Sequence, residues 1–124
     1  MANMSCTSHV QGRAEMIGLL QEARGFVIYS RYENWCLSAH EAVACGLPVL
    51  VQDQKWSREC FGDQVSYLNY HSDSENVRRL KDFYQRAPDL SAPKIPLYDW
   101  DEVGRRIVEI YLKLQPPERP STSL

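Results

Sequence analysis

The chain has 124 residues, of which 44% are hydrophobic and 24% charged, and its formal net charge is −2. This is the composition of one soluble globular domain with a modest core. The near-neutral balance gives no support for a nucleic-acid-binding surface or a polybasic membrane surface, and no apolar run approaches the ~20 residues that span a bilayer. Residues 1–10 lack the basic segment and apolar core of a signal peptide.

The four cysteines show no metal-binding pattern: Cys6, Cys36, Cys45 and Cys60 form no CxxC pair, and no histidine stands at zinc-finger spacing from them. We therefore expect no metal site and interpret the cysteines as small hydrophobic residues. Such cysteines are typical of a reducing, cytoplasmic compartment.

The first half of the chain predicts two helices and two strands. Apolar residues at helical spacing predict a helix over residues 13–23, with Gly25 as its C-terminal cap, before a short apolar strand over 26–29. The segment from Ser38 to Glu41 matches a capping box at the start of a second helix. This helix should end at Gly46, because Pro48 cannot continue it and begins a second buried strand over 48–51.

The second half predicts a short helix, a weaker strand and two longer helices. Asp73 or Ser74 can cap the first long helix, and Trp56 and Trp100 are expected to anchor in the core. Charges cover one face of the last helix and apolar side chains the other. The tail has too little apolar content to pack, which predicts disorder. The expected ranges are a helix at 56–61, a strand at 65–68, a helix from 73 or 74 to about 86, a loop at 87–96, a helix at 99–114 and a tail at 115–124.

Alternating strands and helices predict an α/β fold, with a Rossmann-like open parallel sheet flanked by helices. Three strands are few for such a sheet, so we expect this chain to be part of a larger fold. Its exposed sheet edges and apolar patches would favour self-association. The expected organisation is an N-terminal extension at 1–10, a partial domain at 11–114 and the tail at 115–124.

The loop after the first strand carries the clearest chemical signal. In an open parallel sheet, ligands bind beyond the carboxyl ends of the strands, and the N-terminus of a helix attracts phosphate. Glu33 in this loop and Glu41 on the following helix can accept hydrogen bonds from ligand hydroxyls. Together these features suit a compound that contains a sugar, a diphosphate and a ribose.

Structural roles for the same residues remain open. Glu41 can complete the capping box, and both roles can coexist because a carboxylate accepts several hydrogen bonds. Glu33 alone could be a solvated loop acid. His40 fits a surface or groove residue of the helix better than a catalytic base, and Trp35 can stack on a ligand or pack. Lys55 and Arg58 could face phosphate or lie on a solvated helix face.

The motif that joins these two glutamates also carries a family resemblance. The chain reads Ser30-Arg-Tyr-Glu33-Asn-Trp-Cys-Leu-Ser-Ala-His-Glu41-Ala-Val-Ala-Cys-Gly-Leu-Pro48-Val. This segment resembles the glutamate-x7-glutamate element of the group 1 family of retaining glycosyltransferases, which have the GT-B fold. The resemblance extends over roughly residues 10–114, and it implies the nucleotide-sugar-binding, C-terminal domain of that fold.

The resemblance also implies roles for individual residues. Glu33 would contact the hydroxyls of the donor sugar as the catalytic residue, and Glu41 would hold the ribose of the nucleotide. The helix start at Ser38 would support the diphosphate. The family transfers a sugar from a nucleotide-diphospho-sugar with retention of configuration and needs no metal cofactor. The backbone that would approach the diphosphate and the sugar belongs to Asn34, Trp35, Cys36 and Leu37.

Some positions depart from the family pattern. Asn34 and Cys36 stand where the family has glycines, and Gln54-Lys55 replaces a Gly-Gly pair. The basic pair that grips the diphosphate and the N-terminal acceptor-binding domain are missing, so we expect a donor-binding portion that is inactive alone. The alternatives are a non-catalytic GT-B-like scaffolding or interaction module and a stand-alone flavodoxin-like nucleotide binder.

Overall fold

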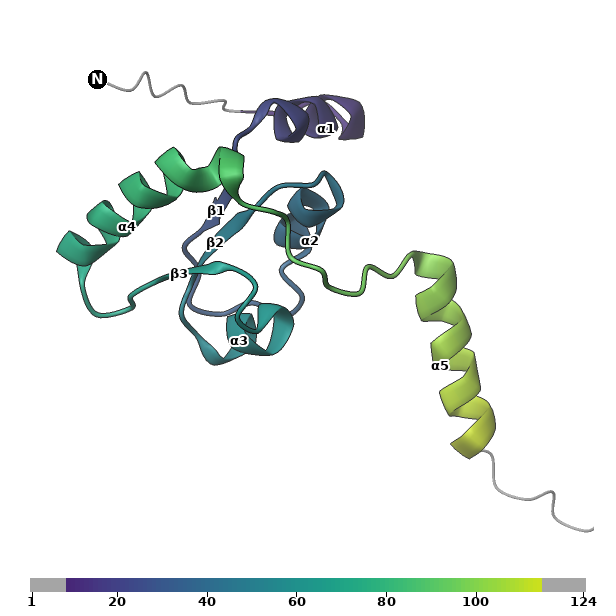
Figure 1. Cartoon of the computed structure of the whole chain (residues 1–124). Helices are drawn as coiled ribbons and strands as arrows, with labels where there is room; N and C mark the ends of the chain where they lie inside the picture. The colour runs from purple at the N-terminus through teal and green to yellow at the C-terminus, as the bar shows by residue number, and fades with distance from the viewer. Residues whose placement is uncertain (1–8, 115–124) are drawn as a thin grey trace, which may run out of the picture.

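The computed structural model describes residues 9–114, and these form an α/β domain followed by a separate helix (Figure 1). The expected tail at 115–124 and most of the expected N-terminal extension lie outside the described residues. Within them, no helix is both long and apolar enough to cross a membrane. The elements are α1 (Arg13–Glu22), β1 (Phe26–Ile28), α2 (Leu37–Ala44), β2 (Val49–Gln52), α3 (Lys55–Phe61), β3 (Ser66–Leu68), α4 (Asp73–Arg86), the 3-10 helix η1 (Ala87–Asp89) and α5 (Trp100–Leu114).

The three strands form one parallel sheet in the order β1-β2-β3. Every residue of the central strand β2 is buried, which is why its sequence is a continuous apolar run rather than an alternating one. The register pairs Val27 with Leu50 and Leu50 with Ser66. This arrangement confirms the predicted fold class, a Rossmann-like open parallel sheet with flanking helices.

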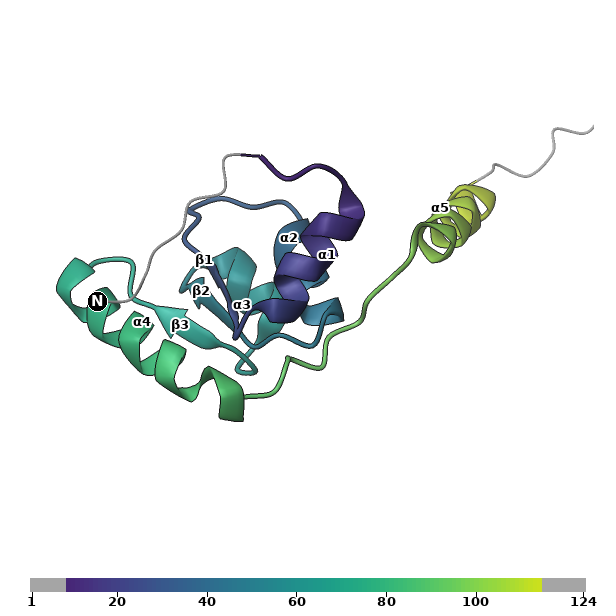
Figure 2. The ribbon, with the colours of Figure 1, turned by 90° about the horizontal axis from the view of Figure 1, so that it is seen from above.

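Alternate residues of β2 build the two halves of the core. Val49 and Val51 point to the face covered by α2 and α3, where they pack with Ala39 and Phe61. Leu50 points to the opposite face and packs with Phe83 of α4. Figure 2 shows α4 on the far side of the sheet from α2 and α3. The helices therefore cover both faces and leave the carboxyl ends of the strands open.

The predicted capping box at the start of α2 is wrong. The N-cap residue is Cys36, whose φ of 45° lies in the left-handed region, and it makes no side-chain cap. Its carbonyl accepts the N–H groups of Ala39 at 3.0 Å and His40 at 3.2 Å, so the helix has begun before Ser38. A reciprocal box stands instead at α3, where Gln54 N–H donates to the hydroxyl of Ser57 at 3.0 Å.

Two other cap predictions are also wrong. Gly25 does not cap α1 with a left-handed residue, because the helix ends at Ala23 in extended conformation. Gly25 is needed for space, since a Cβ there would stand 2.8 Å from the ring of Phe83. Helix α4 is capped by Ser72, whose hydroxyl accepts the N–H of Glu75 at 3.3 Å, rather than by either of the two residues that follow it. The left-handed Gly46 after α2 is confirmed, with a φ of 83°.

The tryptophans differ from each other in their packing. Trp56 packs against the core cluster beneath α2 and α3, as predicted. Trp100 is 79% exposed, so its predicted role as a core anchor is wrong. The reason is the position of α5, which stands apart from the sheet and contains no buried residue (Figures 1 and 2). The loop predicted after α4 begins with the short helix η1.

Candidate functional site

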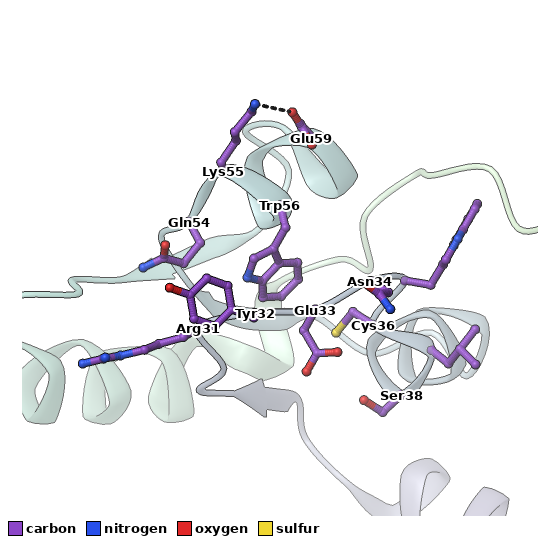
Figure 3. Close-up of a pocket in the computed structure, with 12 residues that line it drawn as sticks. Arg31, Tyr32, Glu33, Asn34, Cys36, Ser38, Gln54, Lys55, Trp56 and Glu59 are labelled. Carbon is purple, nitrogen blue, oxygen red and sulfur yellow. Dashed lines mark ion pairs between the residues drawn. The ribbon is translucent and has the colours of Figure 1, made fainter.

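A cavity of about 990 Å³ lies beyond the carboxyl ends of β1 and β2 (Figure 3). Two loops form it, one between β1 and α2 and the other running from β2 into α3. This is the crevice in which open α/β sheets bind their ligands. Its lining residues are Arg31, Tyr32, Glu33, Asn34, Trp35, Cys36, Leu37, Ser38, Gln54, Lys55, Trp56 and Glu59.

The structure brings together six of the seven predicted site residues. These are the consecutive residues from Glu33 to Ser38, and all of them line the cavity. Glu41 does not line it. Its side chain is 52% exposed on α2, and one carboxylate oxygen lies 4.0 Å from Nη2 of Arg13 on α1. An exposed pair at this distance is weak and leaves the carboxylate able to accept other hydrogen bonds.

Glu33 presents a carboxylate to the cavity. No hydrogen bond or ion pair engages it within residues 9–114, although its side chain is half-buried. Figure 3 shows the carboxylate on the side of the loop that faces Cys36 and Ser38. A carboxylate held in this position can accept hydrogen bonds from two neighbouring hydroxyls of a ligand.

Cys36 joins the loop to α2. It is buried, and its left-handed backbone turns the chain from the loop into the helix. Burial raises the pKa of the Cys36 thiol, and the negative charge of Glu33 raises it further. The thiol is therefore neutral near pH 7 and is not positioned to act as a nucleophile. The role of Cys36 is therefore to shape the wall of the cavity.

The imidazole of His40 supports the same wall from behind. Its Nδ1 lies 3.1 Å from the carbonyl oxygen of Cys36, which can only accept, so Nδ1 carries the hydrogen. The ring stands between Trp35 and Phe61, with centroid distances of 6.3 Å and 5.8 Å. The sequence-based preference for a groove residue over a catalytic base agrees with this packing.

Aromatic side chains give the cavity flat apolar surfaces. Tyr32 is 89% exposed and Trp35 is largely exposed, while Trp56 is half-buried against the core. The indole N–H of Trp56 is buried with no acceptor in the described part of the chain. Rings arranged in this way can stack on the apolar face of a sugar or on a nucleobase. Sequence reasoning identified Trp35 for this role but not Tyr32 or Trp56.

Two cations line the cavity. Arg31 lies 4.9 Å from the centre of the Tyr70 ring, and Lys55 lies 3.8 Å from a carboxylate oxygen of Glu59 in an exposed pair. Arg58 has a structural role instead. It donates two hydrogen bonds of 2.7 Å to Asp53 and stacks over the ring of Tyr67 at 3.7 Å.

The chemistry of the cavity suits a polyhydroxylated, anionic ligand. It combines two carboxylates, of which Glu59 is paired with Lys55, with two cations, stacking surfaces and the start of an eight-residue helix. Unpaired N–H groups at a helix start favour negative charge. Among residues 9–114, no group of three or more histidine, cysteine, aspartate or glutamate side chains is arranged to hold a metal ion.

Comparison with known protein families gives a match that covers most of the described domain. The sequence model described as "Glycosyl transferases group 1" matches residues 2–87, which is more than half of the chain. No curated protein and no solved structure matches the chain. The matched segment contains the whole sheet, both cavity loops and α4. The chain therefore belongs to the group 1 glycosyltransferase family.

Proposed function

We propose that this chain binds the nucleotide-diphospho-sugar donor of a retaining glycosyl transfer, as part of the C-terminal domain of a GT-B fold. The observation that carries the proposal is the position of Glu33. Its carboxylate lies, without a protein partner among the described residues, in a cavity at the carboxyl ends of two parallel strands. The family membership of the chain provides the reaction class.

In this proposal, Glu33 accepts hydrogen bonds from the hydroxyls of the donor sugar. The backbone from Asn34 to Ser38, which includes the start of α2, faces the diphosphate, and Arg31 and Lys55 are the cations of the same cavity. These groups would stabilise the negative charge that develops on the leaving diphosphate without a metal ion. The catalytic contribution of the protein is then electrostatic and positional.

The proposed role of Glu41 requires the ligand to reach beyond the cavity. Glu41 lies on α2, one turn after Ser38, and faces solvent rather than the cavity. A nucleotide whose diphosphate lies at the helix start can place its ribose over this turn. The carboxylate of Glu41 would then accept the ribose hydroxyls, and Arg13 would be displaced at little cost because the pair is exposed.

We further propose that transfer requires an acceptor-binding domain as a partner and that this chain alone binds the donor without turnover. The described cysteines Cys36, Cys45 and Cys60 are free thiols, which supports a reducing, cytoplasmic location. A non-catalytic scaffold of the same fold is the alternative. Such a scaffold would have the same sheet but would not bind the donor.

Backbone amide chemical shifts test the proposal directly. Addition of UDP, GDP or ADP to the isotope-labelled chain should shift the amides of residues 31–38 and 54–59 for one of the three nucleotides. The amides of α5 are the internal control and should not move. If all three nucleotides leave both loops unchanged at millimolar concentration, the donor-binding role is wrong for this chain and the scaffold alternative holds.

A further inference from the structure

Helix α5 carries an apolar stripe that no other element of residues 9–114 buries. The stripe repeats at alternating intervals of three and four residues, which is the spacing of a helix-pairing seam. Most of its side chains are exposed, and no residue of α5 is buried. An amphipathic helix normally buries such a stripe. The stripe consists of Trp100, Val103, Ile107, Ile110 and Leu114.

The helix is well formed without packing on another of the described elements. The carboxylate of Asp99 accepts the N–H of Glu102 at 2.7 Å and caps the first turn. Glu102 in turn pairs with Arg105 and Arg106, one turn further along. Figures 1 and 2 both show α5 apart from the sheet and its covering helices. It also lies outside the segment that matches the family.

The charges along one flank of the stripe indicate what covers it. On a helical wheel, Glu102, Arg106, Glu109 and Lys113 follow one another along this flank, beside the apolar seam. An antiparallel copy of the helix, with the two-fold axis between residues 107 and 108, would place the second copy's Lys113 opposite Glu102. It would also place the second copy's Glu109 opposite Arg106. Every charge on this flank then faces one of opposite sign.

The opposite flank also fits this register, because a small residue on one helix faces a large one on the other. Gly104 would face the second copy's Tyr111, and a Cβ at Gly104 has open space around it, so the ring can lie over the glycine. Along the seam, where the side chains of the two helices interdigitate, Ile107 would lie within one residue of its own counterpart, and Trp100 within one residue of the second copy's Leu114. A parallel pair would instead bring the charged flank against Gly104 and Tyr111, which offer no opposite charge.

We propose that α5 is a dimerisation helix, which pairs with α5 of a second copy of this chain in antiparallel orientation. A 15-residue helix is about 22 Å long, so the interface is small. The association belongs to the weak class and depends on protein concentration.

Sedimentation equilibrium of the full chain, with two matched variants, tests this surface. Ile110 and Leu112 are 57% and 60% exposed on the same helix, but only Ile110 belongs to the stripe. Ile110→Asp should raise the dimer dissociation constant at least about tenfold, because a carboxylate would be buried in the seam. Leu112→Asp should leave it within about twofold. A chain that stays monomeric up to millimolar concentration, or a dimer equally tolerant of both variants, would overturn the proposal.

Charge exchange tests the orientation. Lys113→Glu and Glu102→Lys each place like charges opposite each other in the antiparallel homodimer, so each variant alone should dimerise more weakly. An equimolar mixture should form a heterodimer at least as tight as the unaltered homodimer, because every facing pair is again of opposite sign. Circular dichroism verifies that both variants keep α5 helical. If the mixture associates no better than the separate variants, the antiparallel register is wrong.

Discussion

The imidazole of His40 donates its Nδ1 hydrogen to the carbonyl oxygen of Cys36, 3.1 Å away, and so ties the first turn of α2 to the wall of the cavity. The same ring fills the space between Trp35 and Phe61. One side chain thus joins the core beneath α3 to the loop that carries Glu33. The cavity is held in shape by residues that need not touch the ligand.

His40→Ala should lower the free energy of unfolding by about 1–2 kcal/mol, because a part-buried hydrogen bond and two aromatic contacts are lost together. Urea denaturation measures this change. His71→Ala is the matched control, since His71 is exposed and its ring packs edge-on against the neighbouring ring of Tyr70. It should cost less than about 0.5 kcal/mol. Equal effects of the two substitutions would contradict the bracing role of His40.

Because the backbone of Cys36 is left-handed, glycine should be tolerated at this position better than valine. Cys36→Gly should change stability by less than about 1 kcal/mol, because relief of the backbone cost offsets the loss of a small buried side chain. Cys36→Val should destabilise by about 1–3 kcal/mol, because a β-branched residue disfavours this conformation. Thermal denaturation of both variants checks the order, and a valine variant as stable as the glycine variant would contradict it.

The amide of Gln52 is buried at the end of the central strand, and neither its nitrogen nor its oxygen has a partner among the described residues. Gln52→Met removes these polar atoms at similar volume and should stabilise the fold by about 1–2 kcal/mol. Gln21→Met on the exposed surface of α1 is the control and should be neutral. A destabilised Gln52→Met variant would mean that the amide has partners, such as bound water, that compensate its burial.

The pair of Asp53 and Arg58 predicts a dependence of stability on acid pH. Hydrogen bonds from the Arg58 guanidinium hold the pKa of the Asp53 carboxyl below its usual range, so folding favours the ionised form. This stability is present above the ordinary carboxyl pKa of about 4 and is lost as pH falls through the lower folded value. Asp53→Asn should therefore reduce the loss of stability below about pH 4. Circular dichroism can follow the unfolding of the two proteins as the pH is lowered. Equal slopes of stability against pH for the two proteins would contradict this prediction.

The sequence predicted the sheet better than it predicted the helix caps. The continuous apolar run of β2 is a direct consequence of burial on both faces, so this strand and its parallel neighbours could be predicted. The start of α2 could not, because a left-handed cysteine is rare and Ser38 and Glu41 imitate a common cap. A local pattern cannot reveal a turn that is fixed by packing.

The cavity residues on the loop after β1 could be predicted, and Lys55 was a candidate, but the place of Trp56 in the cavity was missed. Glu33 to Ser38 follow a strand and run into the first turn of α2, so the position of ligand sites at the carboxyl ends of parallel strands predicts them. Trp56 enters the cavity only because α3 packs beside that loop, and sequence spacing does not show this. The stripe of α5 predicted a helix, but an amphipathic pattern does not say which surface will cover it.

Calorimetric titration with nucleotide-sugars tests the central claim most directly. The chain should bind one nucleotide-sugar weakly, and Glu33→Gln should weaken it about tenfold or more while hardly changing the affinity for the matching nucleoside diphosphate. Glu109→Gln on α5 is the control and should bind both compounds as the unaltered chain does. Equal loss for sugar-bearing and sugar-free ligands, or no loss in a folded Glu33→Gln variant, would contradict the assignment of Glu33 to the donor sugar.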